Sequence, residues 1–266
     1  MAPREKPRHP YRDAGRLAAA THRAAGNGAA GRGSAGWQNT QAMIKAIVTD
    51  IEGTTSSIDF VHRTLFPYAK ARIRDFVVRH AAEPEIAREL AEVARIEGRT
   101  LSAEEAGRVL EKWIDEDRKL TPLKALQGLI WREGYQAGEL SGHVYPDTPD
   151  HLRRWHGRGI RLYIYSSGSE EAQRLIFGHS DAGDLTPLFS GYFDTRIGGK
   201  REAASYRTIL ESIGLPGDAV LFLSDVGEEL DAAREAGMQT CQLIRDAKAR
   251  PAPQHPQAKD FAAVGV

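Results

Sequence analysis

Lys45-Ala46-Ile47-Val48-Thr49-Asp50-Ile51-Glu52-Gly53-Thr54-Thr55 opens with apolar and β-branched residues, then changes abruptly to an acid, a spacer, a second acid and a glycine. This pattern predicts a buried strand that carries Asp50 and Glu52 to its carboxyl end. Ligands bind at that end of the strands in open α/β sheets. An aspartate placed there can attack a phosphoryl group or hold a metal ion.

Further apolar runs alternate with helical patterns along the second half of the chain. The runs predict strands at Ile160–Tyr165, Gly191–Phe193, Ala219–Ser224 and Gln239–Ile244. The helical patterns cover Thr148–Arg158, Ser169–Phe177, Ala203–Ile213 and Glu228–Ala236. Strands that alternate with helices predict an α/β fold with a doubly wound parallel sheet.

Residues 60–140 contain helical periodicity and no strand pattern. The expected helices are Phe66–His80, Pro84–Ile96, Ala103–Lys119 and Pro122–Ala137. An all-helical insertion directly after the first strand would lie above the active edge of the sheet as a cap. We therefore expect an α/β catalytic core at 43–59 and 141–250, a helical cap at 60–140, and a C-terminal tail at 251–266.

The first 42 residues differ from the rest of the chain. They hold seven Lys or Arg and two acids, a net charge of +5, and are rich in Gly and Ala. Such a segment buries little apolar surface and is expected to be a disordered N-terminal extension. A transit peptide is one alternative, and an extension upstream of a natural start at Met43 is another.

Composition argues against several classes of protein. The net charge is +0, so no nucleic-acid or membrane surface is indicated. No apolar stretch approaches the ~20 residues of a membrane span. Cys241 is the single cysteine, which excludes an intrachain disulfide and favours a reducing compartment. We expect a cytoplasmic monomer that acts on a small molecule.

Four groups of polar residues follow predicted strands, where the carboxyl ends of parallel strands meet. They are Asp50 with Glu52, Ser166-Ser167-Gly168-Ser169, Gly198-Gly199-Lys200, and Ser224-Asp225 with Glu228 and Glu229. Together they supply an acid nucleophile, hydroxyl and amide donors, a fixed cation and acids that could hold a metal. Phosphoryl transfer needs these parts, because positioning and charge stabilisation carry most of its catalysis.

This ordered set resembles the haloacid dehalogenase superfamily of phosphotransferases over about residues 43–244. Most phosphatases of that superfamily have Asp where this chain has Glu52. The longer segments Asp50–Ile58, Tyr165–Ser169 and Ser224–Val226 are similar to the enolase-phosphatase (acireductone synthase) family of methionine salvage.

The resemblance implies a role for each matching residue. Asp50 would be the nucleophile that forms an aspartyl-phosphate and would also ligate one Mg²⁺, with Asp225 and Glu52 completing the metal site. Glu52 would also occupy the acid/base position. Ser166 would contact the phosphoryl group, and Ser167 and Lys200 would contact the substrate. Lys200 would also act as a catalytic residue that neutralises charge, and Glu229 would orient the metal site.

The implied substrate is 2,3-diketo-5-methylthiopentyl-1-phosphate, which would be enolised and then dephosphorylated to acireductone. The base that enolises it stays open between Glu52 and a cap residue. The aromatic residues Phe60, Phe66, Tyr68 and Phe76 could line a pocket for the thioether or pack the cap. His62 is expected at the surface rather than as a base.

Two other functions remain open from sequence. The first is a general Mg²⁺-dependent phosphatase of small metabolites on the same scaffold. The second, from another class, is a non-catalytic small-molecule binding protein. The latter would require a missing nucleophile or metal acid, and none is missing.

Overall fold

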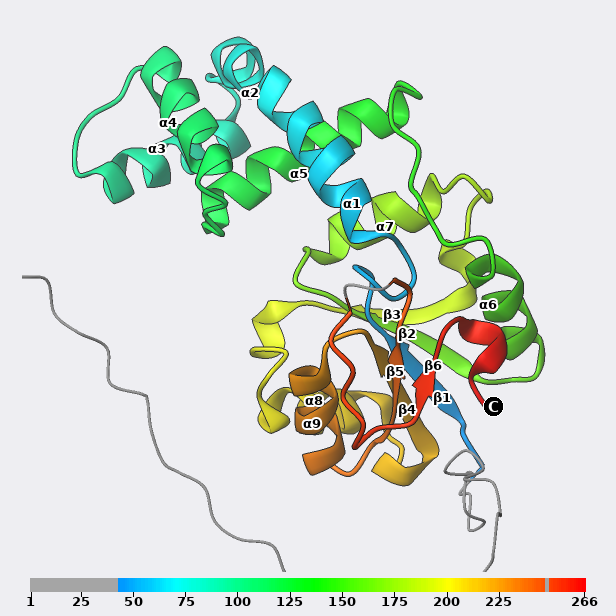
Figure 1. Cartoon of the computed structure of the whole chain (residues 1–266). Helices are drawn as coiled ribbons and strands as arrows, with labels where there is room; N and C mark the ends of the chain where they lie inside the picture. The colour runs from blue at the N-terminus through cyan, green and yellow to red at the C-terminus, as the bar shows by residue number, and fades with distance from the viewer. Residues whose placement is uncertain (1–42, 247–248) are drawn as a thin grey trace, which may run out of the picture. The chain divides into compact units, whose positions relative to one another are not determined.

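The computed structural model describes residues 43–246 and 249–266, so the extension predicted at 1–42 lies outside the described residues (Figure 1). Within these ranges a parallel sheet has the strand order β3-β2-β1-β4-β5-β6. Its strands are β1 (Ala46–Thr49), β2 (Arg161–Tyr165), β3 (Phe189–Phe193), β4 (Val220–Ser224), β5 (Gln239–Leu243) and β6 (Gln257–Ala258). The predicted α/β class with a parallel sheet is confirmed.

Helices cover both faces of the sheet, and strand β1 shows why. Every residue of β1 is buried. Ile47 packs with Leu152 and Phe177 on one face, whereas Ala46 and Val48 belong to a second cluster on the other. A strand buried on both faces is a continuous apolar run, as this sequence has. The covering helices are α6 (Thr148–Gly157) and α7 (Glu170–Gly178) on the first face, and α8 (Ala203–Ile213) and α9 (Gly227–Glu235) on the second.

The segment between β1 and α6 is helical. It contains α1 (Ile58–Phe60), a π-helical turn (Val61–Leu65), α2 (Phe66–His80), α3 (Pro84–Glu97), α4 (Ala103–Asp115) and α5 (Thr121–Gln136). Helices α2 to α5 bury a cluster of their own around Ile73, Leu110 and Trp113. This separate cluster supports the proposed cap limits of 60–140. Figure 1 shows these helices beyond the end of the sheet to which β1 leads. None of the helices in the described ranges could cross a membrane.

Helix α4 ends earlier than the sequence pattern predicts, at Asp115 instead of Lys119. Asp117 has a φ of 50°, in the left-handed region. The N–H of Arg118 donates to the Trp113 carbonyl at 2.9 Å, and that of Asp117 to the Ile114 carbonyl at 3.1 Å. These two bonds form a Schellman motif, with aspartate at the position that glycine usually takes. Residues 116–120 consequently form a loop.

Residues 251–266 were predicted as a tail beyond the core, and this part of the prediction is wrong. They contribute strand β6, which pairs with β5, and they bury Phe261 and Val264 among core residues. The N–H of Phe261 donates to Asp147 Oδ2 at 2.8 Å. A two-residue edge strand has no periodicity, so the sequence pattern could not indicate it. The remaining short turns are 3₁₀ helices at Thr186–Leu188, Thr195–Ile197, Gly217–Ala219 and Phe261–Ala263.

Candidate active site

A buried lysine links two carboxylates at the carboxyl ends of β1 and β4. Lys200 Nζ lies 2.6 Å from Asp50 Oδ1 and 2.8 Å from Glu229 Oε2. Glu229 also accepts a hydrogen bond from Ser224 Oγ at 2.9 Å. Burial by itself would lower the pKa of Lys200, but the two carboxylates outweigh that effect and raise it. Lys200 is therefore held as a cation beside Asp50.

The loop before Lys200 is fixed through its main-chain carbonyls. Tyr165 Oη donates to Gly198 O at 3.1 Å, Ser205 Oγ to Gly199 O at 2.8 Å, and Tyr206 Oη to Lys200 O at 2.7 Å. Because the donors come from β2 and α8, the lysine takes its position from the rigid core. Such positioning is what charge stabilisation in a transition state requires.

Asp225 is a half-buried acid whose environment fits a bound cation. Its Oδ1 is buried without a hydrogen-bond partner within the described residues. Burial, followed by the charges of Asp50 and Glu229, raises the pKa of Asp225 to about 7. Burial and Asp50 likewise raise the pKa of Glu229 to about 7, against the opposing effects of Lys200 and Ser224. A bound divalent cation would relieve this repulsion and satisfy the unpaired oxygen.

The donor set at this position fits Mg²⁺, which prefers oxygen ligands and retains waters. Asp50 and Asp225 would contribute carboxylates, and Glu52 its main-chain carbonyl. No group of three or more His, Cys, Asp or Glu side chains in the described part of the chain is arranged to hold a metal. The proposed set uses only two such side chains, so it does not depend on one.

Gly53 allows the turn after β1 to approach Asp225. Its φ is +75°, and a Cβ at this position would lie 2.4 Å from Asp225 Oδ2. The N–H groups of Thr54, Thr55 and Ser56 all donate to the Ile51 carbonyl, which closes the turn. Both the backbone conformation and the available space therefore require glycine between Glu52 and the following threonines.

Ser166 lies at the end of β2, next to the same edge. It is buried, and its Oγ accepts a hydrogen bond from the Gly168 N–H at 3.2 Å. Ser169 Oγ caps helix α7 by accepting from the Ala172 N–H. Ser169 thus has the capping role that serine often takes, whereas Ser166 faces the site. Ser167 is exposed and lines the adjoining pocket.

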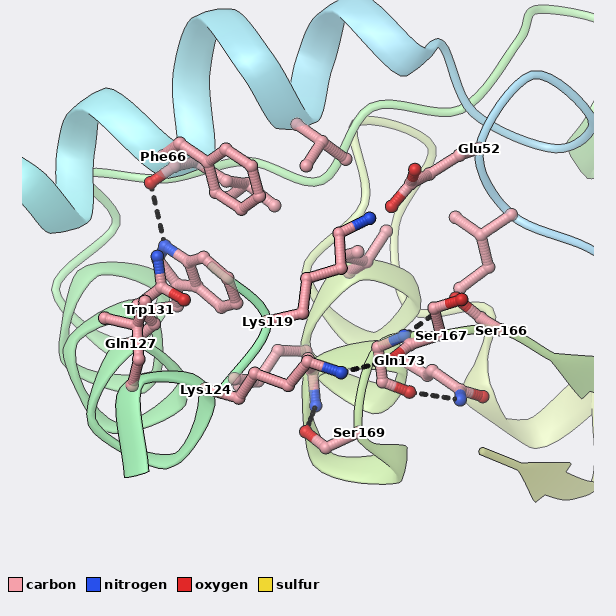
Figure 2. A pocket seen from close by; sticks show the side chains of 18 of the residues that line it. Glu52, Phe66, Lys119, Lys124, Gln127, Trp131, Ser166, Ser167, Ser169 and Gln173 are labelled. Atoms are coloured by element: carbon pink, nitrogen blue, oxygen red, sulfur yellow. Dashed lines mark hydrogen bonds between the residues drawn. The ribbon is translucent and has the colours of Figure 1, made fainter. Parts of the chain in front are cut away.

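A cavity of about 160 Å³ lies between the core edge and the cap (Figure 2). Glu52 and residues 166–169 line its core side. Burial and then the Asp50 charge raise the pKa of Glu52, and Lys200, Lys119 and His62 oppose this rise. The cap side combines apolar and cationic residues, including Leu65, Phe66, Leu123, Trp131, Lys119 and Lys124.

The structure brings together most residues that the sequence singled out. Asp50, Lys200 and Glu229 are in direct contact, and Asp225 lies beside Gly53. Two further expectations concerned the aromatic residues and His62. Phe66 lines the pocket while Phe76 packs inside the cap, so the aromatic set divides between the two roles. His62, expected at the surface, is exposed but also lines the pocket.

Sequence reasoning missed the polar residues of the cap. Lys124 Nζ donates to the Ser167 carbonyl at 3.4 Å, and Lys119 lines the same cavity. On the core side, Gln173 of α7 was also missed, and its Nε2 donates to the Gly168 and Phe193 carbonyls. No motif precedes these residues, and helical periodicity alone does not separate pocket-lining lysines from solvated ones.

Comparison with known proteins first defines the class. A profile of the haloacid dehalogenase-like hydrolases matches residues 44–237. The UTR4 protein of Saccharomyces cerevisiae has a similar crystal structure, with a TM-score of 0.69 and 33% identity over 82% of this chain and 98% of that one. A structure of CbbY from Rhodobacter sphaeroides shares the fold at 19% identity and a TM-score of 0.55, covering 84% of this chain and 97% of that one. The chain thus belongs to the haloacid dehalogenase-like hydrolases.

Relatives of known function identify the family within this class of hydrolases. Enolase-phosphatase E1 of Methylococcus capsulatus is 56% identical over 223 residues, which cover 84% of this chain and 98% of the relative. Enolase-phosphatase E1 of Pseudomonas aeruginosa is 57% identical over 84% of this chain and 99% of the relative. The chain therefore belongs to the enolase-phosphatase E1 family of haloacid dehalogenase-like hydrolases.

Proposed function

We propose that this chain converts 2,3-diketo-5-methylthiopentyl-1-phosphate to 1,2-dihydroxy-3-keto-5-methylthiopentene, the acireductone of methionine salvage, and phosphate. The observation that carries the proposal is the buried Asp50–Lys200–Glu229 cluster, which lies beside the unsatisfied carboxylate of Asp225. The family assignment supports both the enolase and the phosphatase halves.

Asp50 is the proposed nucleophile of the phosphatase half. The Ile51 N–H donates to Asp50 Oδ1 at 2.7 Å, and Lys200 contacts the same oxygen. These contacts orient the carboxylate for attack on phosphorus, which transfers the phosphoryl group from the substrate oxygen to Asp50. Ser166 would donate a hydrogen bond to the transferred group. Water then hydrolyses the aspartyl-phosphate and regenerates Asp50.

One Mg²⁺ per chain would be held by Asp50, Asp225 and the Glu52 main-chain carbonyl, with Glu229 orienting the site. When bound, the ion neutralises phosphoryl charge and polarises the adjacent carbonyl as a Lewis acid. Lys200 instead neutralises the negative charge of the nucleophile, Asp50. Its ion pair with Glu229 keeps it in place when the Asp50 carboxylate is converted to the acyl phosphate.

The product locates the enolisation step. Acireductone has its double bond between C1 and C2, so the proton is lost from C1, the carbon that carries the phosphate ester. The base must therefore lie close to the nucleophile. Glu52, two residues from Asp50 and lining the pocket, is the side chain we assign to this proton. It can then return a proton to the oxygen that leaves phosphorus.

The cap supplies the environment of the substrate tail. The pocket residues Leu65, Phe66 and Leu123 provide apolar surface for the methylthio group. Cap closure would exclude water from the aspartyl-phosphate. The proposed working form is a cytoplasmic monomer, consistent with a single buried cysteine and the core and cap both coming from one chain.

The test is turnover of the diketone phosphate with and without Mg²⁺, following enediol absorbance and phosphate release in the same sample. Both signals should appear together and disappear with a chelator. Phosphate release without the enediol would instead indicate a general metabolite phosphatase. Absence of both signals would contradict the proposed function.

A further inference from the structure

Lys119 is a cation of the pocket that the proposed mechanism does not use. It lies in the loop between α4 and α5, in which the left-handed Asp117 has ended the helix. In Figure 2 its amine points toward the Glu52 carboxylate across the cavity. No hydrogen bond or ion pair of Lys119 occurs within the described ranges, and its charge acts on Glu52.

The other lysines near the cavity are already engaged. Lys200 is paired with Asp50 and Glu229 behind the pocket. Lys124 donates to the Ser167 carbonyl. Among the lysines that line the pocket in the described part of the chain, Lys119 is therefore the one whose ammonium group is available to bind a ligand.

Removal of a proton from C1 creates negative charge that has to be stabilised on the C2 oxygen. The electron pair of the C1–H bond becomes the C1=C2 double bond, and the carbonyl pair of C2 moves to its oxygen. That oxygen lies one carbon beyond the phosphate-bearing carbon, on the side away from Asp50. An oriented cation at this point stabilises the developing charge most effectively when it is excluded from water.

We propose that Lys119 is a catalytic residue of the enolisation step, which binds the C2 oxygen of the substrate from the cap. This inference rests on the proposed function. The C1 proton goes to the base on the core side, while the Lys119 ammonium group donates a hydrogen bond to the C2 oxygen and stabilises its negative charge until a proton from solvent reaches it. Because the core supplies the base and the cap supplies the cation, enolisation requires the cap to be closed.

The experiment compares Lys119→Met with Lys119→Arg in the full-length enzyme. Lys112→Met is the matched control, since Lys112 lies on α4 in an exposed pair with Glu116. Two substrates separate the two half-reactions: the diketone phosphate, and p-nitrophenyl phosphate, whose hydrolysis needs no enolisation. A third measurement is the kinetic isotope effect on kcat with C1-deuterated diketone phosphate.

Lys119→Met should lower kcat for enediol formation by about 10²–10³-fold, the usual loss for one oxyanion donor. Hydrolysis of p-nitrophenyl phosphate should stay close to that of the unaltered enzyme. The isotope effect should increase, because proton transfer becomes rate-limiting, and Lys119→Arg should recover most of the loss.

Equal losses with both substrates, or no loss with the diketone phosphate, would overturn the role of Lys119. So would an arginine variant as slow as the methionine variant. Failure of the unaltered enzyme to turn over the diketone phosphate would instead contradict the proposed function, so the two failures are distinguishable.

Discussion

The core edge and the cap face meet at one cavity but are built in opposite ways. On the core side, Asp50, Lys200 and Glu229 are buried and in mutual contact, and Lys200 is only 9% exposed. On the cap side, Lys119 is exposed and without a partner within the described part of the chain. The charged groups that act in phosphoryl transfer are thus positioned before the substrate binds. The groups that would contact the carbon skeleton of the substrate belong to the cap, which packs separately.

This difference indicates how one site could carry out two reactions. Preorganised charge lowers the barrier of phosphoryl transfer without reorganisation during the reaction. A cap with its own hydrophobic cluster can change its substrate contacts without disturbing the core acids. Variants on the two sides should accordingly differ in kind as well as in size.

The largest effect is expected on the core side. Asp50→Asn should reduce phosphate release by about 10⁴-fold or more, because no nucleophile remains. The fold should persist, since Lys200 retains its contact with Glu229. Acid-quenched reactions should contain labelled phosphoenzyme with the unaltered chain and none with the variant. Full activity in Asp50→Asn would refute the covalent mechanism.

Loss of the buried cation should be the next largest effect, on stability as well as activity. Lys200→Met leaves Asp50 and Glu229 buried without their partner, which should cost about 3–5 kcal/mol of unfolding free energy. Adding Glu229→Gln should recover part of this cost. Urea denaturation with a chelator present gives the comparison, and the exposed Lys112→Met should change little. Equal stability of Lys200→Met and the unaltered chain would argue against the cluster.

Metal removal should expose the repulsion among the acids. The pKa values of Asp225 and Glu229 rise from 3.8 and 4.5 to about 7, so the folded metal-free protein holds protons that the unfolded chain releases. The stability that these two groups contribute should be greatest below pH ~4 and be lost as the pH rises through 7, by up to about 1.4 kcal/mol per pH unit for each group. Thermal unfolding with a chelator should show this slope, reduced in Asp225→Asn.

Added Mg²⁺ should oppose that loss. It should raise the melting temperature more at pH 8 than at pH 5, since protons compete with the ion for the same carboxylates. A flat stability profile between pH 4 and 8, or equal stabilisation by Mg²⁺ at both pH values, would contradict the proposed metal site.

The smallest effect is expected on the apolar part of the cap. Phe66→Leu should raise KM for the diketone phosphate by about tenfold with little change in kcat, since contacts with a remote tail bind ground and transition states alike. Hydrolysis of p-nitrophenyl phosphate should not change. Val78→Ala, on the exposed face of α2, is the control. A decrease in kcat for both substrates would indicate that Phe66 acts on the core edge instead.

The core edge was largely predictable from sequence, and the cap face was not. Asp50, Ser166, Lys200 and Asp225 each follow a strand pattern, so parallel topology places them at one edge. The orphaned oxygen of Asp225 and the contact of Lys200 with Glu229 depend on packing distances that no pattern encodes. Strand β6 escaped prediction because two residues have no period.

The sequence by itself determined the order of the strands' polar ends and hence the class of chemistry, because a buried strand must deliver its last residues to one edge. Tertiary structure decided what faces that edge. The helical pattern of α4 continues toward Lys119, yet the left-handed Asp117 stops the helix at Asp115 and turns the lysine into the cavity. Periodicity reports which residues are apolar, whereas a capping motif depends on backbone angles and on the neighbouring helices that make those angles stable.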